Sequence, residues 1–118
     1  MNGALAVAAG AFGAHALEGA VPDERLATWA TAAHYHAVHA LALVATGAAA
    51  ARLAGSWMRA AGWLFAVGIV LFAGSLYLLV WLDLPALGAA TPLGGVAFLA
   101  GWGCLGAGAW ARTPDLDP

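Results

Sequence analysis

The sequence predicts an all-α integral membrane protein, an antiparallel four-helix bundle made by one transmembrane domain over residues 1–118. Hydrophobic residues make up 64% of the chain and charged residues 8%, whereas an average soluble domain is roughly 25% charged. The charges divide the chain into four uncharged runs, at residues 1–17, 26–51, 60–82 and 84–111. A helix needs about 20 apolar residues to cross the bilayer, so the last three runs are long enough and the first is marginal.

The first helix is expected at about residues 2–17. Within it, Ala6, Gly10 and Ala14 recur every four residues, which is typical of a helix-packing seam. A secretory signal peptide is the alternative, because the run is short and Ala14 and Ala16 resemble a cleavage site. We favour the helix, since no positive charge precedes the run.

The other three helices are expected at about residues 23–51, 57–82 and 92–111. Pro22 and Asp23 suit a helix start, where proline loses no hydrogen bond and a carboxylate complements the positive end of the helix dipole. Ser56 and Thr91 are predicted N-caps, and Pro92 is predicted as the first helical residue after Thr91. The connections are short, so consecutive helices should be antiparallel neighbours.

Arginines indicate the orientation in the membrane. Arg52 and Arg59 flank the connection between the second and third helices and Arg112 follows the fourth helix, whereas the other two connections hold most of the acidic residues. Because cytoplasmic loops are enriched in Lys and Arg, both termini are expected in the cytoplasm. Four tryptophans near helix ends are expected as anchors in the headgroup region: Trp29, Trp57, Trp81 and Trp110.

Small residues indicate where the helices pack. Lipid tails are as apolar as leucine, so membrane helices associate by close contact, which small residues permit. Glycines recur every seven residues along the fourth helix, and small residues are spaced likewise in the third. The predicted packing residues are Gly10, Ala14, Gly68, Gly94, Gly101 and Gly108.

The second helix carries a polar stripe. At about 100° per residue, five polar side chains share one narrow face of this helix: Thr28, Thr31, Tyr35, His39 and Thr46. Exposure of this face to lipid would be costly, so it should point into the bundle or toward a partner. His36 projects about 60° away from His39 and His34 projects to the opposite side.

Polar residues of other helices are expected at the same depth in the membrane as this stripe, when positions are counted from the outer end of each helix. The predicted polar cluster consists of His15, Tyr35, His39, Ser75 and Tyr77. The simpler interpretation is structural, because such groups often just bond to a neighbouring helix. The functional alternative is a ligand or proton site, since histidine titrates near neutral pH and intramembrane ionisable groups are often functional.

Several classes of function are disfavoured. The net charge of −2, with four arginines and no lysine, offers no basic patch for nucleic acid. Cys104 is the only cysteine, so no intrachain disulfide is expected. His34 and His36 diverge around their helix, and no carboxylate or thiolate accompanies the histidines, so we expect no metal, no haem and no other cofactor. No catalytic motif stands out, so we expect no enzyme.

Four motifs resemble the YgdD-like family, which is domain-of-unknown-function family 423 and is related to the animal transmembrane protein 256 group. They are GAFGAHAL at 10–17, YHAVHALAL at 35–43, GSLYLL at 74–79, and TPLGG at 91–95 followed by Phe98, Gly101 and Trp102. The resemblance covers about residues 3–111 and implies a small four-helix protein of bacterial inner membranes with no agreed activity. It also implies that the five cluster residues lie in shared motifs. Relatives usually carry a longer segment before the first helix.

Three functions remain open. The first, which we favour, is a non-enzymatic scaffold or accessory component in the lipid bilayer that associates with itself or with other membrane proteins. The second is an oligomeric transporter or channel protomer that uses His15 and His39. The third is a membrane protein that binds haem, a metal or a quinone through its histidines.

Overall fold

The computed structural model describes residues 1–52 and 55–111. These residues form helices and connections, with no β-strand among them. The elements are α1 (Asn2–Phe12), the π-helix η1 (Gly13–Leu17), α2 (Asp23–Ala50), α3 (Ser56–Gly68), the π-helix η2 (Ile69–Gly74), α4 (Ser75–Leu82), the 3-10 helix η3 (Pro85–Ala90) and α5 (Thr91–Trp110). Arg112 of the orientation argument lies outside the described residues.

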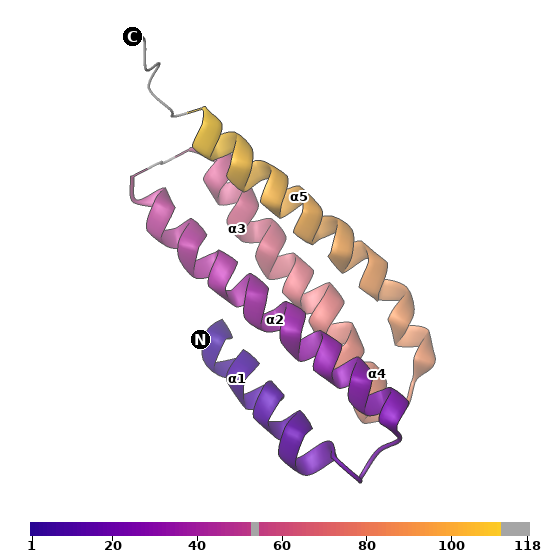
Figure 1. The fold of residues 1–118 in the computed structure, drawn as a ribbon. Coiled ribbons are helices and arrows are strands. Elements are labelled where there is room, and N and C mark those ends of the chain that lie inside the picture. Colours follow the sequence, from indigo (N-terminus) through magenta and orange to yellow (C-terminus); the bar gives the residue numbers. More distant parts are fainter. Residues whose placement is uncertain (53–54, 112–118) are drawn as a thin grey trace.

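The elements join into four helical rods that lie side by side along the long axis of the molecule (Figure 1). The rods are α1–η1, α2, α3–η2–α4 and η3–α5. Gly13 at the start of η1 lies against Trp29 near the start of α2, and Gly108 near the end of α5 lies against Met58 near the start of α3. The end of one rod therefore meets the start of another.

The connection between the third and fourth rods is more regular than expected. Residues 83–91 were predicted to connect the two helices, with Thr91 as the N-cap, but Pro85–Ala90 form a 3-10 helix that continues into α5. Pro85 suits this helix start, because its fixed φ angle is already helical and its missing N–H is not needed there. Thr91 makes no side-chain cap; its Oγ1 lies 2.8 Å from Ser75 Oγ on α4.

The α3 start also differs from the prediction at its cap. Ser56 is the first residue of α3, the N-cap position is taken by Gly55, and no side chain caps this end. At α2, Pro22 is the N-cap and Asp23 lies in the first turn. Trp57, Trp81 and Trp110 are exposed near helix ends.

Trp29 is not an interface anchor but part of the contact between α1 and α2. Its side chain is buried, and its indole Nε1 donates a hydrogen bond to the Ala9 carbonyl oxygen at 2.7 Å. Gly13 allows this approach, because a Cβ there would overlap the indole ring. Gly10 and Ala14 are exposed instead, and a Cβ on Gly10 would meet nothing within 4 Å. The close contact of the first rod with α2 is thus made by Gly13, the first residue of η1.

Glycines bring α5 against α3 and η2. A Cβ on Gly94 would collide with the backbone of Phe72, and one on Gly68 would collide with the Phe98 ring. A Cβ on Gly101 would lie 2.8 Å from the ring of Phe65, which is completely buried. Backbones that approach this closely gain the van der Waals contact that holds membrane helices together.

Two of the four rods are long and apolar enough to cross a membrane by length and composition, Ser56–Leu82 and Pro85–Trp110. The 28 residues of α2 are long enough, but histidines, threonines and Tyr35 lower its hydropathy. Asn2–Leu17 is apolar but shorter. The two rods that fit least well are therefore the ones that carry the histidines.

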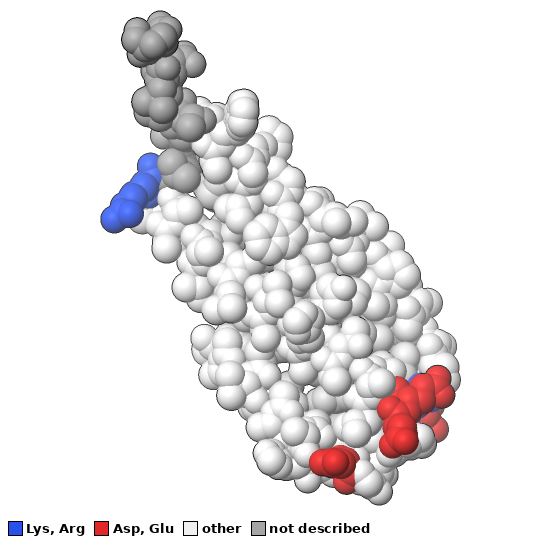
Figure 2. All heavy atoms as spheres, viewed as in Figure 1, with Lys and Arg blue, Asp and Glu red and all other residues white. Residues whose placement is uncertain are grey.

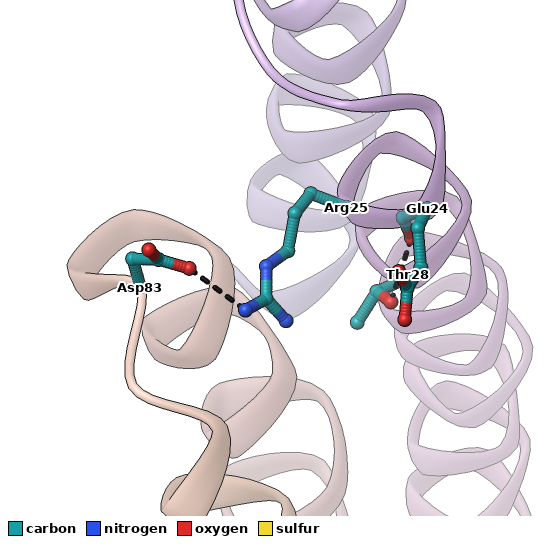
Figure 3. Close-up of polar contacts among 4 residues, drawn as sticks. All are labelled: Glu24, Arg25, Thr28 and Asp83. Carbon is teal, nitrogen blue, oxygen red and sulfur yellow. Dashed lines mark hydrogen bonds and ion pairs between the residues drawn. The ribbon is translucent and has the colours of Figure 1, made fainter.

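Charged side chains gather at the ends of the rods. Figure 2 shows acidic side chains at the end where α1 connects to α2, and an uncharged surface over the middle of the visible face. At the acidic end, Arg25 donates to the Asp83 carboxylate at 2.7 Å (Figure 3). Asp83 adopts a left-handed conformation, with φ of 52°, and ends α4 as a C-cap, a role for which Asp is better suited than most side chains.

Candidate functional site

The two buried histidines of α2 are the centres of two separate polar groups. One is centred on His39 and lies between α2 and α5. The other is centred on His36 and lies between α2 and α4. His15, which was predicted to join His39, is exposed on η1 and makes no hydrogen bond within residues 1–52 and 55–111.

His39 has a partner for each ring nitrogen. Its Nδ1 lies 2.7 Å from the carbonyl oxygen of Tyr35. Because a carbonyl can only accept, Nδ1 carries the proton in this arrangement. The other nitrogen, Nε2, is then an acceptor and receives a hydrogen bond from the indole Nε1 of Trp102 at 3.2 Å. His39 is therefore held as one neutral tautomer.

Aromatic rings enclose the His39 imidazole. The ring stacks on Phe98 with centroids 3.5 Å apart and an interplanar angle of 9°, and Phe65 and Trp102 lie beside it. Only 4% of His39 is exposed. The packing and the hydrogen bonds together indicate a structural role for this side chain.

Tyr35 lies at the edge of the same group. Its ring packs against Phe72 at a centroid distance of 4.6 Å, but 41% of the residue is exposed. Its hydroxyl makes no hydrogen bond within the part of the chain that the structure describes. Tyr35, Phe72, Phe98 and Trp102 line a groove of about 510 Å³ between α2 and α5.

His36 has a partner on one nitrogen only. Its Nδ1 lies 3.2 Å from the hydroxyl of Tyr77 on α4. Its Nε2 is buried and has no hydrogen-bond partner in the described part of the chain. The ring of Tyr77 also packs against Trp29 at 4.6 Å, so this second group ties α2 to α4.

Ser75 is hydrogen-bonded to neither His36 nor His39. Its hydroxyl lies 2.8 Å from Thr91 Oγ1 and donates to the Phe72 carbonyl oxygen at 2.9 Å. The Ser75–Thr91 pair connects α4 to the start of α5. Thus the five residues of the predicted cluster are divided: Tyr35 and His39 lie together, Tyr77 binds His36, Ser75 binds Thr91, and His15 stands apart.

Sequence reasoning missed His36, Trp102 and Thr91 as site residues. The signal available for His36 was its spacing of three residues from His39, which places both on neighbouring directions of one helix. No sequence signal paired Trp102 with His39. Within residues 1–52 and 55–111, no three or more His, Cys, Asp or Glu side chains lie close enough to hold a metal ion.

Comparison with known proteins places this chain among membrane proteins. Residues 9–95 match the family model described as protein of unknown function DUF423. The UPF0382 membrane protein YwdK of Bacillus subtilis (strain 168) is 52% identical over 103 residues, which cover 86% of this chain and 84% of the relative. The UPF0382 membrane protein SAB0533 of Staphylococcus aureus (strain bovine RF122 / ET3-1) is 43% identical over 104 residues, with 86% and 83% covered.

The UPF0382 membrane protein SH2409 of Staphylococcus haemolyticus (strain JCSC1435) is 42% identical over 100 residues, with 83% of this chain and 80% of the relative covered. No solved structure matches the chain significantly. The family assigned from the four motifs is confirmed. This chain is a helical membrane protein that belongs to the DUF423 family of unknown function.

Proposed function

We propose that this protein is a non-enzymatic component of the bacterial inner membrane that acts as a scaffold or accessory protein and associates with a second copy of itself. In this proposal the four rods form an antiparallel bundle that spans the membrane four times. Both termini face the cytoplasm. The partner helix lies on the outer face of α2.

The charges support this orientation. Arg52 follows α2 and Arg59 lies in the first turn of α3, whereas Glu18, Asp23 and Asp83 lie at or beside the other connections. Arg25 is the exception at the acidic end, and its charge is offset by the Asp83 carboxylate. Within residues 1–52 and 55–111, Arg52 and Arg59 make no ion pair, and an excess of arginine at one end favours that end for the cytoplasm.

The observation that carries the self-association is an exposed histidine in the middle of α2. His34 is exposed, its ring lies 5.8 Å from the ring of Tyr35, and Tyr35 is exposed as well. Polar side chains at such depth almost always face a protein partner or a water-filled cavity rather than lipid. The outer surface around His34 should therefore be covered by another helix.

The composition of this surface suits a close helix contact. Exposed alanines lie on the same face of α2 as His34, on either side of the exposed Leu41, and would let a second backbone approach: Ala27, Ala30, Ala37, Ala45 and Ala48. A two-fold contact presents the same patch on both subunits, so one alanine-rich face is enough to build it. The outer face of α2 thus supports a second copy as the partner.

The transport alternative has less support from the geometry. It needs His15 and His39 on one route, but His15 is exposed on η1 and His39 is enclosed by Phe65, Phe98 and Trp102. Both ring nitrogens of His39 are already bonded. A relay through His39 would have to break these bonds.

Cysteine cross-linking in membranes tests the proposed contact. Both cysteine variants are made in a Cys104→Ala background. Val38→Cys places the cysteine one turn from His34 on α2. Val67→Cys on α3 is the matched control, because Val38 and Val67 are similarly exposed, at 38% and 44%. Oxidation should give a disulfide-linked dimer with Val38→Cys and little with Val67→Cys, because a disulfide requires Cα atoms within about 7 Å.

His34→Leu in the Val38→Cys background should lower the cross-linked fraction at least about twofold, because it removes the polar group that the partner covers. Equal cross-linking at both cysteines would contradict a specific contact on α2. A uniform monomer by native mass spectrometry, without any Val38→Cys dimer, would overturn the proposal.

A further inference from the structure

The buried nitrogen of His36 leaves a hydrogen bond unmade. His36 is 6% exposed, and its Nε2 has no partner in the described part of the chain. If Tyr77 donates to Nδ1, then Nε2 carries a proton with no acceptor. If Nδ1 donates to Tyr77, then Nε2 is an acceptor with no donor. Either tautomer leaves a buried polar atom unpaired, which is rare in native proteins and calls for a missing partner.

A groove with room for such a partner lies beside this pair. His36 and Tyr77 line a space of about 590 Å³ between α1, η2, α4 and η3, a size within the range of small-molecule sites. Apart from the polar side chains of Asn2, His36, Ser75 and Tyr77, its lining is apolar. Apolar side chains on its outer side include Leu5, Val70 and Leu78, which are all exposed. A ligand could therefore enter from the lipid.

The floor of the groove is an irregular helix. The π-helix Ile69–Gly74 contributes five of the thirteen residues that line the groove and leads directly into the α4 turn that carries Tyr77. π-helical turns are rare and occur frequently at functional sites. This segment brings Tyr77 to His36 and places Val70 and Leu71 along the groove.

The depth of His36 restricts the chemistry of the ligand. His36 lies near the middle of α2 and far from the charged ends of the rods. A charged group at this depth would be expensive to bury. The ligand's polar end should therefore be uncharged. Its body should be hydrocarbon, because Leu5, Val70 and Leu78 offer only apolar contacts.

We propose that this groove binds an uncharged, lipid-soluble molecule whose polar end is a carbonyl or hydroxyl group that hydrogen-bonds to His36 Nε2. A carbonyl accepts from Nε2–H when Tyr77 donates to Nδ1. A hydroxyl donates to Nε2 when Nδ1–H donates to Tyr77. The pair can therefore serve either head group by a change of tautomer. This inference concerns a different face of α2 from the one proposed for self-association and does not depend on it.

Binding of two probes to the purified full chain in lipid nanodiscs tests the site. A decyl-benzoquinone represents the carbonyl head and dioctanoylglycerol the hydroxyl head; the thermal unfolding midpoint is followed against probe concentration. At least one probe should raise the midpoint in a saturable manner. His36→Leu should weaken that probe's apparent Kd about tenfold, as expected for one lost hydrogen bond, and His34→Leu, the control on the exposed histidine, should leave it within about twofold.

A second variant separates binding from folding. Val70→Trp adds bulk on the outer side of the groove and leaves both polar side chains in place, and Val70 is 68% exposed, so the fold should tolerate the change. It should abolish the saturable shift, while Val67→Trp on the same rod should not. The proposal would be overturned if neither probe bound, or if the probes bound equally to all variants. It would also be overturned by a high-resolution map that showed one water as the partner of His36 Nε2. Saturation by only one probe would identify the head group.

Discussion

His39 and His36 lie three residues apart on α2 and are almost equally buried, at 4% and 6% exposed, yet their ring nitrogens are hydrogen-bonded differently. His39 has a bonded partner on each ring nitrogen and a stacked phenylalanine. Both residues line a groove, but within the described part of the chain His36 has a bonded partner on one ring nitrogen only. Burial alone therefore does not assign a role to a membrane histidine; the partners on each nitrogen do. The comparison separates a structural histidine from a candidate binding histidine.

The largest effect on stability is expected from Gly94→Ala, which tests the packing of α5 against η2 beside the His39 group. A methyl group there would lie 2.8 Å from the Phe72 Cα atom and still closer to the Phe72 backbone nitrogen, so α5 must move away from η2 and carry Phe98 with it. We expect a loss of about 3 kcal/mol in unfolding free energy, measured by denaturant titration in micelles. Gly103→Ala, with nothing within 4 Å, is the control and should be neutral or slightly stabilising. Equal stability of both variants would refute the packing argument.

His39→Ala should have the next largest effect. It removes the ring that stacks on Phe98 and leaves the Trp102 indole without its acceptor. We expect a loss of about 2 kcal/mol in the same titration. His15→Ala, at an exposed histidine, should change stability by less than about 0.5 kcal/mol. A small effect of His39→Ala would break the comparison, because His39 would then not be structural.

The smallest effect is expected when both members of the His36 pair are replaced. His36→Leu leaves the Tyr77 hydroxyl unbonded and Tyr77→Phe leaves Nδ1 unbonded, so each single change should cost about 1 kcal/mol. His36→Leu also removes the unpaired Nε2. The double variant leaves neither member of the pair without its partner, so its loss should be clearly smaller than the sum of the two single losses, about 2 kcal/mol. A double-mutant cycle measures this coupling. Additive losses would show that His36 stabilises the fold without Tyr77.

Composition and turn residues predicted the helical membrane protein, because lipid requires long apolar runs and proline limits where helices start. Pro22 and the uncharged runs therefore gave element positions close to those observed. Pro85–Ala90 was not predicted, since a short 3-10 helix has no periodic pattern of its own.

The site was harder to predict because it depends on how neighbouring rods turn. A helical projection orders Tyr35, His36 and His39 around α2, but it does not locate α4 or α5. The π-helix η2 changes the phase of the third rod between Ile69 and Gly74, which brings Tyr77 to His36. The same limit applies to Gly10 and Gly13, which lie on adjacent faces of the first rod; only the position of Trp29 decides which one is packed.

The most direct test is the ¹⁵N NMR spectrum of histidine-labelled protein in lipid bilayers, with resonances assigned through His36→Leu and His39→Ala. We predict that His39 is a single neutral tautomer with the proton on Nδ1, in the presence and absence of added ligand. We also predict that the His36 resonances shift when the decyl-benzoquinone or dioctanoylglycerol binds. A mixture of tautomers at His39, or a His36 spectrum that neither probe changes, would contradict the division into a complete and an incomplete site.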